Sequence, residues 1–194
     1  YQVWPDQKLE KQIHGLLEVF DQHIINEESH HLKLFFNEKW HAKSEIISFG
    51  HDVEASWLML EAAEVLGDEG IIDKFKLLAL SMASSAARGL DESGALTYEL
   101  EPNEWNKEKH WWVQAEAMVG FLNAFELSGD ALQYDRFLNC WNFVKNHVID
   151  RQYGEWFWGL NEDLSLMPLQ DKVGLWKCPY HNVRACLEVI KRLK

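Results

Sequence analysis

The sequence has few cysteines and none of the patterns that usually make them functional. Its three cysteines, Cys140, Cys178 and Cys186, form no CxxC pair and no regular framework, so neither a disulfide scaffold nor a structural zinc site is expected. We therefore expect reduced thiols and a cytoplasmic protein. A glycine-rich phosphate loop and a GxSxG elbow are also absent, which disfavours phosphoryl transfer and α/β-hydrolase chemistry.

Long hydrophobic runs and an excess of positive charge are missing as well. No apolar stretch approaches the roughly 20 residues that a membrane-spanning helix needs. The 19 basic residues are outnumbered by 31 acidic ones, for a net charge of −12. We expect neither nucleic acid nor an anionic membrane to be the main partner.

Tryptophan, in contrast, is abundant. There are ten tryptophans, and several are close neighbours, as in Trp111-Trp112 and Trp156-Phe157-Trp158. Such rings fill helical cores, but beside polar groups they also stack on sugar rings. Both interpretations remain open for each tryptophan.

Helical periodicity dominates the chain and predicts an all-α fold. Asp6 is a candidate N-cap for the first helix, and Gly67 a candidate C′ residue for the second. Short β-like segments are expected at 32–36, 95–99 and 155–159, in long loops gathered at one end of stacked helical hairpins. We find no linker and predict one domain over residues 1–194. The six predicted helices cover about 9–24, 52–66, 71–87, 111–127, 131–148 and 179–193.

His51 lies in the segment Gly50-His51-Asp52-Val53-Glu54-Ala55-Ser56-Trp57. It is expected at or just before the N-cap of the second helix, with Glu54 one turn in. An acidic residue near a helix N-terminus can be purely structural. Alternatively, His51 lies on the rim of a cavity and Glu54 orients it or binds a hydroxyl. The HxxE spacing has no second matching set, so no metal site is predicted.

His181 lies in Trp176-Lys177-Cys178-Pro179-Tyr180-His181-Asn182, with Pro179 suited to the first turn of the last helix. Imidazole is the side chain that titrates nearest neutrality, so two histidines facing one cavity can take and return a proton. A capping or buried structural role for His181 is the alternative.

The segment Lys109-His110-Trp111-Trp112-Val113-Gln114-Ala115-Glu116 opens the fourth helix. Trp112 and Glu116 share a face at i, i+4 spacing, which can set a stacking ring above a carboxylate or simply build the core. The remaining histidines lack a distinctive context and are predicted to be surface residues; they are His14, His23, His30, His31, His41 and His147.

Taken together and in order, GHDVEASW, KHWWVQAEA, GEWFW and WKCPYHNVRACLE resemble the N-acylglucosamine 2-epimerase superfamily, most of all its cellobiose 2-epimerases. The resemblance covers essentially the whole chain. It implies the carboxy-terminal half of an (α/α)6 barrel, with about six helices and short β-hairpin loops. Members of this family are about twice as long.

The resemblance also implies roles for individual residues. His51 and His181 match the two catalytic histidines, which exchange the proton at C2 of the reducing-end sugar. Glu54 matches the family's acidic partner in the GHDxE motif, and Trp176 matches a tryptophan that lines the sugar site. One of Trp111 and Trp112 matches another substrate-binding tryptophan, and we prefer Trp112 because it shares a face with Glu116. All four are candidate substrate-binding residues. No cofactor is implied.

The implied function is an isomerase that epimerises the reducing-end glucose of β-1,4-linked disaccharides at C2. The alternatives are an N-acylglucosamine 2-epimerase, an aldose–ketose isomerase of a monosaccharide, or a carbohydrate-binding fragment without catalysis. A glycoside hydrolase would need two carboxylates across the scissile bond and is disfavoured. The family's sugar-holding Arg and Asn lie in its upstream half, which the resemblance does not cover. We expect this chain alone to be inactive or to self-associate through the face which that half would cover.

Overall fold

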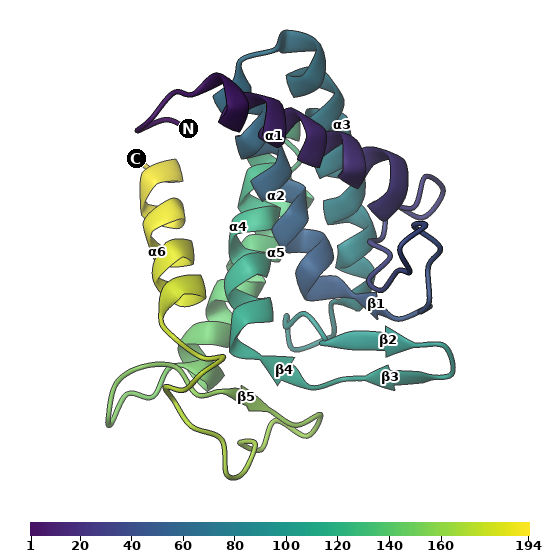
Figure 1. Ribbon diagram of the computed structural model, residues 1–194. Coiled ribbons are helices and arrows are strands. Elements are labelled where there is room, and N and C mark those ends of the chain that lie inside the picture. The colour runs from purple at the N-terminus through teal and green to yellow at the C-terminus, as the bar shows by residue number, and fades with distance from the viewer.

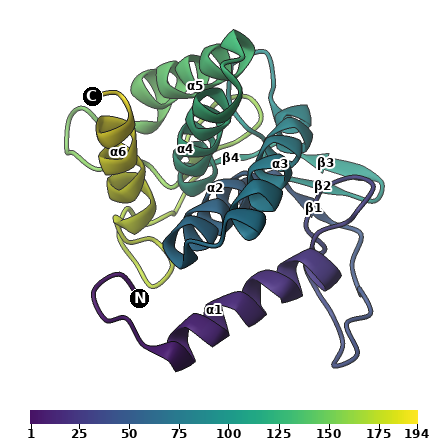
Figure 2. The ribbon, with the colours of Figure 1, turned by 90° about the horizontal axis from the view of Figure 1, so that it is seen from above.

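The six helices form two layers, with the central helix α4 between α2 and α6 and with α3 and α5 packed behind (Figure 1, Figure 2). The computed structural model describes all residues 1–194. This arrangement is an open half of an (α/α)6 barrel, as predicted. The bounds are α1 (Gln7–Val19), α2 (Phe49–Leu66), α3 (Glu69–Ala86), α4 (Trp111–Ser128), α5 (Ala131–Phe143) and α6 (Tyr180–Arg192).

Two of the connections between helices are tight turns of the same design. Gly67 and Gly129 end α2 and α4 with left-handed φ angles of 77° and 69°, which a glycine adopts without steric cost. Asp68 and Asp130 follow at once and cap the next helix, accepting hydrogen bonds from its first free N–H groups. The repeated Gly-Asp therefore makes α2–α3 and α4–α5 antiparallel hairpins.

The long connections lie at the opposite end of the helices and carry all the strands (Figure 1). Strands β1, β2 and β3 form an antiparallel sheet, and β4 pairs with β5. The segment 32–36, predicted to be β-like, forms only isolated bridges at its ends, and the strands near 95–99 and 155–159 begin later than predicted. The bounds are β1 (Ile47–Ser48), β2 (Glu99–Glu101), β3 (Glu104–Asn106), β4 (Lys109–His110) and β5 (Gly159–Leu160).

The predicted first and fifth helices each end in a single π-helical segment. α1 continues as Phe20–Ile24 and α5 as Val144–Val148. The predicted helix ends at Ile24 and Val148 are therefore confirmed. The last turn of each helix is a π-turn, which is wider than an α-turn. A 3₁₀ turn, Ala87–Gly89, similarly extends α3.

Helix α4 is the centre of the main core. It is apolar on nearly all sides, and 13 of its residues are buried, as expected for a helix with neighbours all round. A second, smaller core lies between α1, α2 and α3, around Leu17, Met59 and Phe75. None of the helices is both long and apolar enough to cross a membrane.

Gly120 lets α4 approach α2 closely, and its replacement is expected to be costly. A Cβ at Gly120 would lie 2.3 Å from Val53 Cγ2 and 2.8 Å from the Val53 carbonyl oxygen. We expect Gly120→Ala to lower the free energy of unfolding by about 1–3 kcal/mol, because the two backbones must separate. Urea denaturation measures the change.

The matched control is Gly15→Ala in α1, where a Cβ would meet nothing within 4 Å. Alanine loses less backbone entropy than glycine in a helix, so this variant is expected to gain about 0.5–1 kcal/mol. Equal effects at both positions would contradict the close-approach explanation.

Candidate active site

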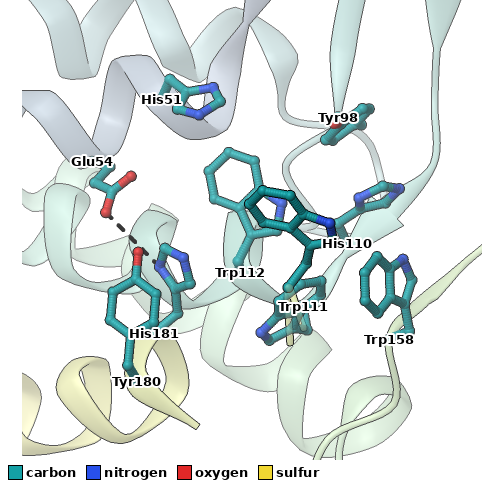
Figure 3. Close-up of a pocket in the computed structure, with 10 residues that line it drawn as sticks. His51, Glu54, Tyr98, His110, Trp111, Trp112, Trp158, Tyr180 and His181 are labelled. Carbon is teal, nitrogen blue, oxygen red and sulfur yellow. Dashed lines mark ion pairs between the residues drawn. The ribbon is translucent and has the colours of Figure 1, made fainter. Parts of the chain in front are cut away.

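The N-terminal ends of α2, α4 and α6 meet at the strand-bearing end of the molecule and enclose a pocket of about 360 Å³ (Figure 3). All six candidate site residues line this pocket, although they are up to 130 positions apart in the sequence. They are His51, Glu54, Trp111, Trp112, Trp176 and His181. The lining residues are His51, Glu54, Tyr98, His110, Trp111, Trp112, Trp158, Trp176, Tyr180 and His181.

His51 lies in the first turn of α2, two residues into the helix rather than at its cap. Its Nδ1 is 2.8 Å from Ser48 Oγ, so the N-cap serine binds the imidazole instead of a backbone N–H. This contact leaves Nε2 without a hydrogen-bond partner. Burial lowers the pKa of His51, and the nearby His181 lowers it further while Asp52 opposes the change. His51 is therefore held as a neutral imidazole.

The His51 pKa shift predicts a pH effect on stability. The unfolded chain binds a proton at His51 near pH 6.5, whereas the folded chain does so only at lower pH, so protonation stabilises the unfolded state as pH falls below about 6.5. We expect the urea midpoint to fall less between pH 7.5 and 5.5 in His51→Gln than in the unchanged chain. An equal fall in both would contradict the shift.

His181 lies in the first turn of α6, as predicted, and contacts a carboxylate from α4. Its Nδ1 is 2.7 Å from Glu116 Oε1, and Glu116 is fully buried. The other oxygen of Glu116 accepts a hydrogen bond from Trp57 Nε1 at 3.1 Å. A carboxylate that accepts from Nδ1–H fixes the tautomer of a neutral imidazole. His181 thus also has Nε2 free.

Glu54 does not orient His51, contrary to one of the two roles expected for it. Its Oε1 accepts a hydrogen bond from Arg184 at 2.6 Å and lies 3.8 Å from His181 Nδ1 (Figure 3). Glu54 lies about one turn after His51 and contacts α6 through Arg184, whereas His51 contacts Ser48. Burial raises the pKa of Glu54, repulsion by Glu116 adds to this, and Arg184 opposes it.

Trp112 lies between the two imidazoles. Its ring centre is 4.7 Å from that of His51 and 5.7 Å from that of His181. Gly50 makes room for it, since a Cβ there would lie 2.6 Å from the end of the indole ring. Trp111 is buried instead, against Trp158 with ring centres 4.6 Å apart. The geometry favours Trp112 as the ring that faces a ligand.

Trp176 lines the pocket from the loop before α6 but is 80% exposed. The next residue, Lys177, is fully buried and donates to Glu155 at 2.9 Å. Asn182, in the first turn of α6, donates to the same oxygen at 2.9 Å. This shared acceptor ties the loop to the start of α6 and so positions His181.

His110 and Tyr98 also line the pocket, although the sequence does not single them out as site residues. Their rings stack with centres 3.9 Å apart, and His110 Nε2 is 2.8 Å from Glu108. Burial lowers the pKa of His110, although Glu108 opposes the shift. His110 belongs to β4, not to the helix, and the pairing of β4 with β5 is what turns it to the pocket. No local signal marks Tyr98.

The prediction that His31 is a surface residue is wrong, because the structure buries its side chain. Its Nδ1 is 2.7 Å from Asp52 Oδ2, while Asp52 Oδ1 accepts from the backbone N–H of Leu32 at 2.7 Å. Asp52 is fully buried. This pair ties the loop after α1 to the first turn of α2, beside His51.

Glu54, Glu116 and His181 offer atoms that lie within 4.8 Å of one another, close enough to bind a cation. The guanidinium of Arg184 already supplies the positive charge at this point, donating to Glu54 at 2.6 Å and to Glu116 at 2.7 Å. The donor set is therefore satisfied by an arginine and does not fit a resident metal ion.

Comparisons with known proteins point to one family. The family model described as N-acylglucosamine 2-epimerase (GlcNAc 2-epimerase) matches residues 1–185. A cellobiose 2-epimerase of Bacteroides fragilis is 44% identical over 98% of this chain and 49% of its own length. The rat N-acylglucosamine 2-epimerase is 35% identical over 74% of this chain and 35% of its own length.

Solved structures show the same correspondence. The cellobiose 2-epimerase of Bacillus thermoamylovorans superposes with a TM-score of 0.93 at 37% identity, covering 99% of this chain and 49% of the other. The chain spans about half the length of the curated relatives it matches.

Proposed function

Because the chain belongs to the N-acylglucosamine 2-epimerase family, we propose that it carries the proton-transfer residues of a sugar 2-epimerase acting on β-1,4-linked disaccharides. The substrate is the reducing-end glucose of cellobiose, and the product is glucosyl-mannose. Cellobiose is proposed as the substrate, rather than another sugar, because the relatives that match nearly the whole chain are named cellobiose 2-epimerases.

One observation carries the proposal. Of the three imidazoles that line the pocket, those of His51 and His181 are bound through Nδ1 and have Nε2 free, whereas His110 is bound through Nε2. Such a pair can remove a proton from one face of a carbon and return one to the other face. Trp112, between them, offers an aromatic surface for the sugar.

The proposed reaction begins with an opened reducing-end sugar whose C1 is an aldehyde. One histidine takes the C2 proton, so that C1–C2 becomes a double bond and the C1 oxygen takes up the negative charge of the enediolate. The other histidine then donates a proton to the opposite face of the planar C2, and the C1 aldehyde forms again. The N-terminal ends of α2, α4 and α6 all lie at the strand-bearing end of the molecule (Figure 1), and residues from the first turns of all three line the pocket. Their positive dipole ends favour a negatively charged intermediate. Glu54, Trp111, Trp112 and Trp176 are proposed to bind the substrate.

The test is deuterium uptake at C2 in heavy water, followed by NMR, with cellobiose, N-acetylglucosamine and mannose compared side by side. It uses the whole protein, meaning a polypeptide of the relatives' length that contains this chain. We expect uptake with cellobiose and formation of glucosyl-mannose. Preference for N-acetylglucosamine or mannose would reassign the substrate, and binding without uptake on any sugar would overturn the proposal.

The chain alone is proposed to be inactive and to self-associate, and the whole protein is proposed to be cytoplasmic. On α6, Val183, Leu187 and Ile190 form an exposed apolar stripe, each about half exposed or more. We expect light scattering to show species larger than the 22.7 kDa monomer. A monomer with full turnover would contradict this expectation.

A further inference from the structure

Two buried carboxylates lie side by side next to His181. Glu116 Oε1 is 2.7 Å and Glu54 Oε1 is 3.8 Å from the same nitrogen, His181 Nδ1. Like charges this close raise each other's affinity for a proton, and burial strengthens the effect. Without a fixed positive charge, this pair would be expected to bind a proton itself or to keep His181 protonated.

Arg184 supplies that positive charge from one turn further along α6. A single nitrogen, Nη2, donates to Glu54 at 2.6 Å and to the Glu116 oxygen that also contacts His181 at 2.7 Å. The arginine therefore bridges α2, α4 and α6 at their ends nearest the pocket. Arg184 and the His181 imidazole contact the same oxygen of Glu116. Arg184 itself does not line the pocket.

The guanidinium is held in this place by two aromatic rings. Its central carbon lies 5.0 Å from the centre of the Trp57 ring and 5.1 Å from that of Tyr180. Trp57 donates to the second oxygen of Glu116, so the arginine and its acceptor are fixed by the same side chain. Arginine, planar and always charged, suits a site that combines stacking with paired carboxylates.

We propose that Arg184 is a positioning residue that keeps the Glu54 and Glu116 carboxylates charged and in place and so sets the protonation of the catalytic His181. This rests on the proposed epimerase function. The groups that face His181 are Glu116 from α4, Glu54 and His51 from α2, and Tyr180 from its own helix. None of these neighbours carries a permanent positive charge, and Arg184 supplies one through its contacts with the two carboxylates.

The proposal predicts the direction of a pH effect. Removing the guanidinium leaves two carboxylates opposite His181, so the cluster binds its protons more tightly. In Arg184→Met, the pH optimum of kcat/KM for epimerisation by the whole protein is expected to move to higher pH by about one unit. Arg184→Lys keeps the charge and is expected to keep the optimum, at lower kcat, because an ammonium lacks the planar face that packs against Trp57 and Tyr180.

A charge-compensating variant separates electrostatics from packing. Glu54→Gln combined with Arg184→Met removes one negative and one positive charge, and is expected to bring the optimum back toward that of the unchanged protein. Arg192→Met is the matched control: Arg192 lies two turns further along α6 and pairs with Glu126 and Glu188 outside the pocket. It is expected to leave the optimum in place.

A readout independent of turnover distinguishes this proposal from the proposed function. NMR of labelled histidine follows the pH at which the His181 imidazole binds a proton in the same variants. A shift to higher pH in Arg184→Met supports the role of Arg184 even where no sugar is epimerised. An unchanged titration, or an unchanged pH optimum with uniformly lower activity, would overturn it. If Arg184→Met does not fold, Arg184→Gln takes its place in the same comparison.

Discussion

Replacing His51 or His181 by alanine is expected to lower kcat for epimerisation at C2 by about 10²- to 10⁴-fold. In each imidazole Nδ1 is bound to another side chain, which leaves Nε2 available to the substrate, and both rings lie close to Trp112. Without one of them, a proton removed from one face cannot be returned to the other, so C2 is not inverted. The measurement is the rate at which the whole protein forms the C2 epimer, followed by NMR.

The two variants should differ little from each other, because epimerisation in either direction needs both histidines. His41→Ala is the control, since His41 is exposed on the loop between α1 and β1, away from the pocket lining. Formation of the C2 epimer at the unchanged rate in His51→Ala or His181→Ala would remove that residue from the proposed mechanism. A change in KM alone would assign it to binding.

Replacing Asp52 by alanine is expected to lower the free energy of unfolding by about 3 kcal/mol or more. The fully buried carboxylate is bound to His31 Nδ1 and to the Leu32 N–H, both at 2.7 Å. Its loss leaves two buried donors without acceptors, because His31 is only 3% exposed. Denaturation by urea at neutral pH measures the change.

Two controls test the cause. Asp52→Asn keeps an oxygen for the Leu32 N–H and nearly the same volume, so it is expected to be clearly less destabilising. Asp73→Ala removes an exposed carboxylate paired with Lys76 on α3 and should leave stability nearly unchanged, as exposed ion pairs contribute little. Similar losses in Asp52→Ala and Asp73→Ala would contradict the importance of the buried pair.

The helices could be predicted from the sequence because their signals are local. Caps at Asp6, Asp68 and Asp130 and the left-handed glycines Gly67 and Gly129 lie where the helices begin and end. The strands were predicted less well. Their pairings join segments far apart in the chain, such as Lys109 with Leu160, and no residue pattern within either segment encodes the partner.

The candidate site divides in the same way. Motifs single out His51 and His181, since each stands in an unusual local sequence at a predicted helix start. Their partners are not local. Glu116 is 65 residues from His181 and 59 from Trp57, so its role as their shared acceptor cannot be seen from spacing.

The same limit explains the errors. The sequence shows Glu54 one turn after His51 but not that α6 presents Arg184 to it across 130 residues. His31 lies in a polar segment, which predicts a surface position, but in the structure its loop packs against Asp52.

From the sequence by itself, caps and periodicity predicted the helices, and the ordered motifs indicated the family, implied its half barrel and singled out the two histidines, because these signals act over a few residues. Only the tertiary structure decided which side chains those histidines meet. Hydrogen bonds and ion pairs depend on the packing of α2, α4 and α6 to within a fraction of an ångström, and many residues far apart in the chain set that packing together.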